Sequence, residues 1–377
     1  MTLDFKQIDA DSHVQETGGS WELYLAEEYK DRRPAVIENP YVSGRPLRDK
    51  TWYIDGRLVP KNQGSGAVVM STPAEMSFAK KKPVAVPVQA CTDPLERVEY
   101  MRRANVHKTV MFSTLFLETV TDDLVYEAAL MRAWNTWASE MCKKSPEHLA
   151  FGAVVPVRDP GLAVREMRHA KELGACTVMV LPTAGRHQLH ERFLDPFWAE
   201  AQHLDMPVSV HIGWPNPDVV HDCTSPCAVF LGAFETSMWW AYLSVFAGGI
   251  LDRFPKLRVG FFENDCRWFE IFVARALHWQ PTTAAFPWPA KRSVKDYLAE
   301  SQVFFSYEGD FAALPRFLDL VGDDKVMAAM DFPHTHYGTA NLSEALDFVR
   351  NHEHLTLARK RKLLRDNALA FFGWKDE

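Results

Sequence analysis

The chain has 377 residues, of which 47% are hydrophobic and 24% charged, and these values are typical of a globular protein with a large buried core. With 42 basic against 49 acidic residues the net charge is -7, so the sequence lacks the positive excess that nucleic-acid-binding domains carry. Its six cysteines show no disulfide pattern and its first residues contain no apolar signal-peptide core, so we expect a cytoplasmic protein without a membrane span.

The first predicted strand leads directly into ionisable residues. Residues 7–16 read Gln-Ile-Asp-Ala-Asp-Ser-His-Val-Gln-Glu, an apolar opening followed by acids and a histidine. Because side chains alternate along a strand, Asp9, Asp11 and His13 are expected on one face. A carboxylate beside an imidazole at a strand end is suited to binding a metal, and a polar turn after a strand is the alternative.

A long irregular segment, residues 17–90, follows this strand and is rich in proline and glycine. Within it, residues 50–59 predict a small hairpin with its turn at Asp55 and Gly56. A segment of this length inside a compact enzyme is typical of a lid or binding loop, and a packing excursion is the alternative.

From residue 91 onward, strands and helices alternate. Helices are predicted to start at the Asp-Pro pairs of Asp93, Asp159 and Asp195, because aspartate caps a helix and proline suits its first turn. Seven apolar runs after the first strand predict further strands, at 108–113, 150–156, 176–181, 207–211, 257–263, 303–306 and 325–331. Eight strand–helix units predict one α/β domain over residues 1–377, a (β/α)8 TIM-type barrel with a long insertion after its first strand; an open doubly wound sheet is the alternative.

The longest apolar stretch, Thr236–Leu251, is too short to span a bilayer. We expect it to form a buried helix that runs through Trp239 and Trp240 to Phe254. A helix of this kind would also suit a subunit interface.

Four predicted strands end in residue types that bind metals. These residues are Asp11, His13 and Glu16 of the first strand, His211 of the fifth, Glu263 of the sixth and Asp331 of the eighth. In a barrel the carboxyl ends of all strands meet at one mouth, where the active site lies. The sequence therefore predicts that these side chains meet at one metal site.

These pieces together resemble the amidohydrolase superfamily, in the branch grouped with aminocarboxymuconate-semialdehyde decarboxylase. The matching segments cover essentially the whole chain and are residues 9–16, 207–211, 253–263 with Trp268, 330–334 and 367–373. The fold of that family is a distorted, metal-bearing (β/α)8 barrel, in agreement with the strand pattern.

The resemblance implies a divalent metal bound by Asp11, His13, His211 and Asp331. It also implies that Asp331 takes and gives a proton at metal-bound water, with His211 beside it in the catalytic site. Many members carry histidine where this chain has Asp11 and Glu263, so the site gains carboxylates. With Glu16, this oxygen-rich set suits Mn or Fe at least as well as Zn, and it suits one ion or two.

Three further residues are candidates for substrate binding. His334 lies three positions after Asp331 and is either a substrate contact or a structural residue. Arg267, just after the sixth strand, suits a bidentate contact with a carboxylate, and Arg186 lies in a loop over the barrel mouth. A solvated surface charge is the alternative for both arginines.

Three functional hypotheses follow. The first is a metal-dependent enzyme that hydrolyses a C–N, C–O or C–C bond of a small molecule or decarboxylates a small carboxylated substrate. The second is a dinuclear Fe/Mn monooxygenase on the same fold, which Glu16 and Glu263 favour. The third is a non-catalytic supporting subunit of a hetero-oligomer. We expect a homo- or hetero-oligomer that acts on a small molecule, with neither nucleic-acid nor membrane partners.

Overall fold

The structure is a computed structural model that describes residues 3–38, 50–59, 84–223, 225–263, 266–280, 288–300, 302–309, 312–334 and 343–375. Its main sheet has eight parallel strands in the order β1-β5-β6-β7-β10-β11-β12-β13. They are β1 Ile8–Val14, β5 Lys108–Ser113, β6 Leu149–Val154, β7 Thr177–Val180, β10 Val208–His211, β11 Val259–Phe262, β12 Val303–Tyr307 and β13 Val326–Ala328. Each coincides with a predicted strand.

The sheet closes into a barrel where its first strand meets the chain just after its last. Ser12 in β1 forms a parallel bridge with Phe332, and the backbone N–H of Asp331 donates to the carbonyl of Asp11 at 3.0 Å. The backbone N–H of His13 also donates to the carbonyl of Phe332. The predicted (β/α)8 barrel is therefore confirmed, and the alternative prediction of an open doubly wound sheet is wrong.

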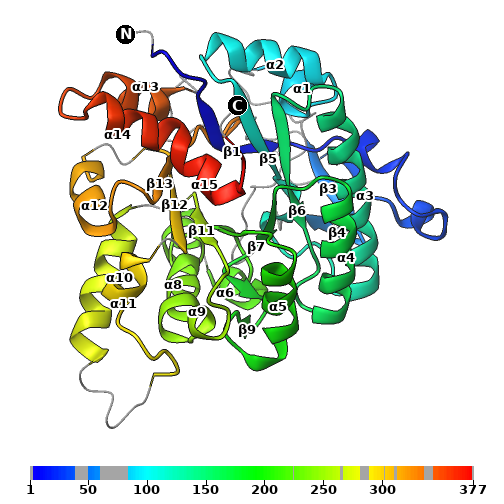
Figure 1. Ribbon diagram of the computed structural model, residues 1–377. Coiled ribbons are helices and arrows are strands. Elements are labelled where there is room, and N and C mark those ends of the chain that lie inside the picture. Colours follow the sequence, from blue (N-terminus) through cyan, green and yellow to red (C-terminus); the bar gives the residue numbers. More distant parts are fainter. Residues whose placement is uncertain are drawn as a thin grey trace.

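Helices cover the outside of the barrel, and the last ones in the chain lie beside β1 (Figure 1). The longer helices are α2 Pro94–Arg103, α3 Leu124–Lys143, α4 Pro160–Glu172, α5 Asp195–His203, α10 Cys266–Trp279, α12 Leu314–Val321 and α13 Glu344–Asn351. The shorter ones are α1 Val86–Gln89, α6 Pro217–Asp222, α7 Pro226–Ala228, α8 Ser237–Tyr242, α9 Ile250–Arg253, α11 Val294–Ala299, α14 Leu357–Arg361 and α15 Asn367–Phe372. Within the described ranges, no helix is long and apolar enough to cross a lipid bilayer.

Two of the three predicted Asp-Pro helix starts are confirmed as caps. The Asp93 carboxylate accepts hydrogen bonds from the backbone of Leu95 and Glu96, and the Asp159 carboxylate accepts one from Leu162. In α5, Asp195 is the first helical residue and does not cap the helix.

The single buried helix predicted to run from Thr236 to Phe254 is wrong. The segment divides into α8, a π-helical turn at Leu243–Ala247, and α9. Gly249 between them has a φ of 72°, which glycine adopts without strain. A β-carbon at Gly248 would lie 2.2 Å from the Cβ of His190, so the loop after β7 approaches the backbone closely at the break.

The described part of the irregular segment 17–90 contains a small antiparallel sheet. Its strands are β2 Ala35–Glu38, β3 Lys50–Ile54 and β4 Arg57–Val59. The predicted hairpin is confirmed, because Asp55 and Gly56 join β3 to β4 with φ values of 50° and 80°. A second small sheet, β8 Thr183–Ala184 with β9 His187–Gln188, follows β7.

Candidate metal centre

A β-bulge in β1 gives Asp9 a different place from the potential metal ligands Asp11 and His13. After Asp9, which pairs with Thr109, the register of β1 against β5 shifts by one residue. The Asp9 carboxylate accepts hydrogen bonds from Thr109 Oγ1 at 2.9 Å and from the backbone of Met330 at 2.8 Å. Asp11 and His13 instead join a cluster of potential ligands that does not include Asp9.

The core of this cluster is formed by Asp11 and His13 of β1 and His211 at the end of β10. The Nε2 atoms of His13 and His211 lie 3.0 Å apart. Asp11 Oδ1 lies 3.5 Å from His13 Nε2, and Asp11 Oδ2 lies 3.4 Å from His211 Nε2. All three side chains are fully buried, so the structure brings together three predicted ligands from two strands.

Two acids from other strand ends lie beside this core. Asp331 Oδ1 is 3.3 Å from His13 Nε2 and 2.9 Å from His334 Nδ1, and Glu263 Oε2 is 4.0 Å from His211 Nε2. Asp331 and Glu263 have φ values of 49° and 51°. This left-handed backbone costs about 1–3 kcal/mol for a residue with a side chain, and such strain is concentrated at functional sites.

The carboxylates repel one another inside the barrel. Burial raises the pKa of Asp11 well above its usual range, and the negative charge of Asp331 raises it further. The pKa of Glu263 is raised well above its usual range by the same two causes in the same order. A bound cation would offset this repulsion and favour the ionised carboxylates.

The imidazoles are held in the neutral form that metals require. Burial, with a contribution from His334, holds the pKa of His13 well below its usual value, and burial also lowers the pKa of His211. His211 Nδ1 lies 2.8 Å from the carbonyl of Ile212 and donates its hydrogen there. The lone pair of His211 Nε2 is therefore free to face the cluster.

These residues fit a divalent metal ion. Among the described residues, neither carboxylate oxygen of Asp11 has a hydrogen-bond donor, although the side chain is fully buried. Buried polar atoms are normally paired, so two unpaired oxygens facing two neutral imidazoles indicate a missing positive partner. Carboxylate oxygen and imidazole nitrogen are ligands of Zn, Mn and Fe.

Comparison with known proteins identifies the family. A family model described as Amidohydrolase matches residues 86–374. The chain belongs to the amidohydrolase family. The resemblance inferred from the motifs is thus confirmed. A curated relative, the γ-resorcylate decarboxylase of Polaromonas sp., is 26% identical over 262 residues, which are 64% of this chain and 75% of the relative.

Solved structures show the same fold in this family. An amidohydrolase from Mycobacterium avium subsp. paratuberculosis K-10 superposes with a TM-score of 0.76 at 20% identity, and the match covers 99% of this chain and 100% of that one. The 5-carboxyvanillate decarboxylase of Novosphingobium aromaticivorans, complexed with manganese and 4-hydroxy-3-methoxy-5-nitrobenzoic acid, has a TM-score of 0.72 at 18% identity, with 98% and 96% covered.

One acid beside this site, Glu308, is not among the residues predicted from the sequence. It follows β12, and Ser306 Oγ donates to Glu308 Oε1 at 2.5 Å. The backbone N–H of Glu263 donates to Ser306 Oγ at 2.8 Å and to Glu308 Oε1 at 3.2 Å. The available signal was its position at a strand end, but the seventh strand was predicted to stop at Ser306 and continues to Tyr307.

Glu16, a predicted ligand, lies in a separate hydrogen-bonding network. Its carboxylate accepts hydrogen bonds from Ser113 Oγ at 2.5 Å, from Trp134 Nε1 at 2.8 Å and from the backbone of Leu115 at 3.0 Å. Burial raises its pKa to about 7. The oxygens of Glu16 are thus engaged in tying β1 to the end of β5.

The two predicted substrate-binding arginines are exposed. Arg186 forms a two-pronged ion pair with Asp218, with distances of 2.5 and 2.8 Å. Arg267 lies on α10 and is exposed. His334 is the predicted substrate-binding residue that lies at the cluster, where its Nδ1 contacts Asp331.

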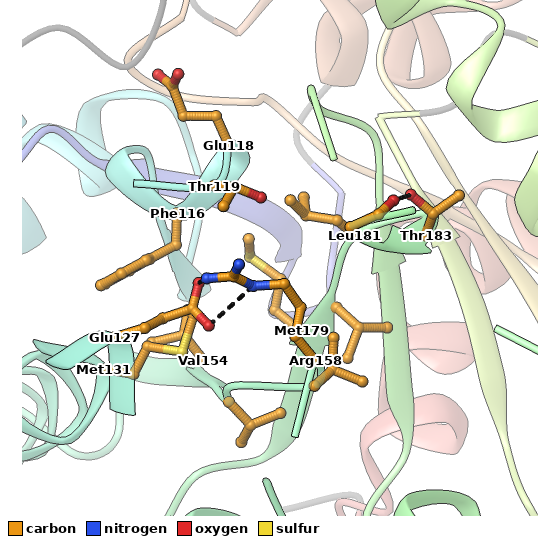
Figure 2. A pocket seen from close by; sticks show the side chains of 14 residues that line it. Phe116, Glu118, Thr119, Glu127, Met131, Val154, Arg158, Met179, Leu181 and Thr183 are labelled. Atoms are coloured by element: carbon orange, nitrogen blue, oxygen red, sulfur yellow. Dashed lines mark hydrogen bonds and ion pairs between the residues drawn. The ribbon is translucent and has the colours of Figure 1, made fainter. Parts of the chain in front are cut away.

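A cavity opens at the carboxyl ends of β5, β6 and β7. It encloses about 430 Å³ of empty space, part of it open to solvent. Figure 2 shows apolar side chains such as Phe116 and Met179 around an ion pair between Arg158 and Glu127. The two charged groups lie 2.8 Å apart and are mostly buried. Mostly apolar walls with a few polar groups are typical of small-molecule sites.

Proposed function

We propose that this protein is a metal-dependent decarboxylase that removes CO2 from a small aromatic carboxylic acid and uses manganese. The observation that carries the proposal is the cluster of Asp11, His13 and His211, with two Nε2 atoms 3.0 Å apart beside a carboxylate that has no donor among the described residues. The γ-resorcylate decarboxylase relative supports the reaction, and the manganese of the 5-carboxyvanillate decarboxylase supports the metal. Of the two reactions that the sequence leaves open, these relatives favour decarboxylation over hydrolysis.

The proposed ligands are Asp11, His13, His211 and Asp331. A bound divalent ion would hold the substrate carboxylate and offset its negative charge. In the cavity, Arg158 already pairs with Glu127 and donates to the carbonyl of Thr121 at 2.6 Å, so its charge is engaged. We therefore assign the recognition of the substrate carboxylate to the metal centre and the binding of its apolar part to the cavity wall.

Asp331 and His334 are suited to supplying the proton. Decarboxylation breaks the bond between the carbon and its carboxylate, leaves the electron pair on the carbon and replaces CO2 by a proton. Asp331 Oδ1 and His334 Nδ1 lie 2.9 Å apart and can hold one proton between them. The His334 side chain is 18% exposed and the Asp331 side chain 0%. His334 therefore connects the buried acid to the open side of the site, and its Nε2 contacts Thr114 Oγ1 at 3.2 Å.

We also propose that the chain is one domain, in which the described part of the insertion at residues 17–90 packs beside the cavity. Arg32 donates to Asp55 at 2.8 Å and to Asp123 at 3.1 Å. Thr121 Oγ1 donates to Asp55 at 2.6 Å. These contacts fix the small sheet of the insertion to the start of α3, on the side of the barrel where the cavity opens.

The test is CO2 release from a panel of hydroxybenzoic acids, including γ-resorcylate, by protein loaded with Mn²⁺. We expect turnover that EDTA abolishes and, in D2O, a product with deuterium at the carbon that lost its carboxylate. Asp331→Asn should lower kcat by about 100-fold or more, because general acid–base catalysis typically contributes that much. The matched control is Asp324→Asn, since the Asp324 side chain is 76% exposed.

Three results would overturn the proposal. Release of CO2 that persists without metal would remove the metal from the reaction. Amide or lactone hydrolysis without CO2 release would favour the other reaction of this fold. Failure of every preparation to turn over any substrate would support the supporting-subunit hypothesis.

A second candidate is a dinuclear Fe/Mn oxygenase. The observation that favours it is Glu308, which adds a carboxylate to a site that already has Asp11, Glu263 and Asp331. Oxygen-rich ligand sets suit Fe and Mn. Substrate-dependent consumption of O2 by iron-loaded protein would support this candidate, and CO2 release under nitrogen at the aerobic rate would exclude it.

A further inference from the structure

The cavity contains an ion pair to which the proposed reaction assigns no role. Arg158, in the loop after β6, lies 2.8 Å from Glu127 of α3, and their side chains are 18% and 5% exposed. Both line the cavity together with apolar side chains such as Phe116, Met131 and Met179. A buried ion pair is weak evidence for stability, because removing its charges from water is costly. We propose that Arg158 determines substrate specificity by donating a hydrogen bond to an uncharged oxygen substituent of the substrate ring, a methoxy or hydroxyl group; this inference rests on the proposed function.

One nitrogen of the Arg158 guanidinium remains available to a ligand. Nε donates to Glu127 Oε2 at 3.2 Å, and Nη2 donates to the carbonyl of Thr121 at 2.6 Å and lies 2.8 Å from Glu127 Oε1. Nη1, which carries two further N–H groups, has no hydrogen-bond partner among the described residues. Figure 2 shows this third nitrogen pointing away from Glu127. Arg158 therefore has a donor left for a group bound in the cavity.

Neighbouring residues hold this donor in position. Glu127 and the carbonyl of Thr121 engage two of the three nitrogens. A β-carbon at Gly185, in the turn between β8 and β9, would lie 3.3 Å from Arg158 Cδ, so this turn packs against the aliphatic part of the side chain. A donor that is already fixed loses little conformational entropy when a ligand binds, and its hydrogen bond is stronger in apolar surroundings than in water.

The charges of the pair determine which substituent suits the cavity. Glu127 already neutralises Arg158, so a second carboxylate on the substrate would gain no net attraction and would lie close to the carboxylate of Glu127. An ammonium group would be repelled by the guanidinium. An alkyl group would displace water from Nη1 without replacing its hydrogen bond, which is costly for a charged donor. An uncharged oxygen satisfies the donor, and the methyl of a methoxy group suits the apolar wall.

The cavity lies close enough to the metal centre for one substrate to reach both. His211, a proposed metal ligand, is followed two residues later by Gly213. A β-carbon at Gly213 would lie 2.9 Å from Cδ2 of Leu181, which lines the cavity. Two residues of extended chain span at most about 7 Å. An aromatic acid whose carboxylate is held at the metal centre is therefore placed to direct a ring substituent towards Arg158.

The experiment measures binding, so its result does not depend on turnover. Calorimetric titration of the Mn²⁺-loaded protein compares each ring isomer of methoxybenzoate with the ethylbenzoate substituted at the same position, since the two differ in shape very little and only one carries the oxygen. The measured quantity is the Kd of the ethylbenzoate divided by the Kd of the methoxybenzoate. At one ring position we expect this ratio to fall by about 10-fold or more when Arg158→Met is combined with Glu127→Leu, because a hydrogen bond to a charged group contributes about that much.

The double variant removes both charges together, and replacing a buried ion pair by apolar side chains of similar volume is often neutral for stability. The matched control combines Arg168→Met with Glu200→Leu. These residues form an ion pair between α4 and α5 at 2.7 Å and do not line the cavity. We expect the ratio in this control to equal that of the wild type.

Glu127→Gln tests the charge argument. This variant keeps the size of the side chain and removes the charge that neutralises Arg158. At the same ring position, we expect the affinity for the benzenedicarboxylate relative to the methoxybenzoate to rise by about 10-fold or more, because an arginine without a partner binds a carboxylate strongly. A purely structural role of the pair would not produce this gain.

An unchanged ratio in the folded double variant would overturn the proposal, and so would an unchanged preference in Glu127→Gln or a wild-type protein that binds none of the methoxybenzoates. Circular dichroism shows whether each variant folds; if the double variant does not, Glu127→Gln still decides. CO2 release with an unchanged ratio would leave the proposed function standing. A changed ratio without CO2 release would leave the role of Arg158 standing and remove the reaction.

Discussion

Gly152 in β6 is the position where a single methyl group would most directly disturb the metal centre. A β-carbon there would lie 2.2 Å from Cε1 and 2.6 Å from Cδ1 of Phe112. Ordinary contact begins at 3.4 Å, so in Gly152→Ala the Phe112 ring must move by about 1.2 Å. The ring is fully buried, and its centroid lies 6.2 Å from that of His13 and 5.7 Å from that of His211. The displaced ring therefore presses on two proposed ligands.

The expected cost of Gly152→Ala has two parts. Overpacking a core site costs about 1–3 kcal/mol of unfolding free energy. Disturbing the support of metal ligands typically lowers metal affinity by about 10- to 100-fold. The first part is measured by urea unfolding of the metal-free protein, and the second by calorimetric titration with Mn²⁺.

Two further variants make the Gly152→Ala result specific. Adding Phe112→Leu to Gly152→Ala shortens the clashing side chain and should recover most of the Mn²⁺ affinity. Gly232→Ala is the control, since its β-carbon would meet only the Cys223 Sγ at 3.9 Å. Unchanged stability and affinity in Gly152→Ala, or a loss that Phe112→Leu does not repair, would refute the reasoning.

Two other predictions concern buried charges outside the ligand set. Arg97 is fully buried and donates to His13 O at 3.3 Å, Val88 O at 3.1 Å and Ser12 Oγ at 2.5 Å. In Arg97→Lys the lysine cannot donate to all three acceptors, so the free energy of unfolding should fall by about 1–3 kcal/mol for each acceptor left unpaired. Urea unfolding measures this change, and an unchanged midpoint would contradict the prediction. Burial raises the pKa of Glu16 from 4.5 to about 7, so the folded protein binds this proton more tightly than the unfolded chain does. Proton binding by Glu16 therefore stabilises the fold at low pH, and this stabilisation is lost as pH rises from about 4.5 through 7. Glu16→Gln cannot ionise, so its stability relative to wild type should rise by up to about 3 kcal/mol between pH 4.5 and 8, and parallel pH profiles would show that Glu16 does not titrate there.

The sequence predicted the barrel well because its strands are short apolar runs separated by capped helices. The caps at Asp93 and Asp159 are local interactions, so neighbouring residues suffice to place them. His211 and Asp331 each stand at the carboxyl end of a predicted strand. In a barrel these strand ends meet at one mouth, so the two side chains were expected near the same site.

The errors have non-local causes. The bulge after Asp9 and the separate network of Glu16 depend on how β1 pairs with β5, about 100 residues later in the chain. The break at Gly248 depends on His190, which a window around the apolar stretch does not contain. Glu308 was missed because β12 was predicted one residue too short, and strand boundaries are the least certain part of any pattern-based assignment.

The seam of the barrel also determines when the site can be completed during synthesis. Ser12 and Phe332 are 320 positions apart in sequence, and the adjacent Asp11 and Asp331 both supply a carboxylate to the proposed centre. A nascent chain that has emerged only through β10 holds Asp11, His13 and His211 but lacks the acids of the later strands. Closing so long a loop is slow and entropically costly, so full metal occupancy follows the docking of the last strand. Tightly bound metal would thus report that the seam of the barrel has closed.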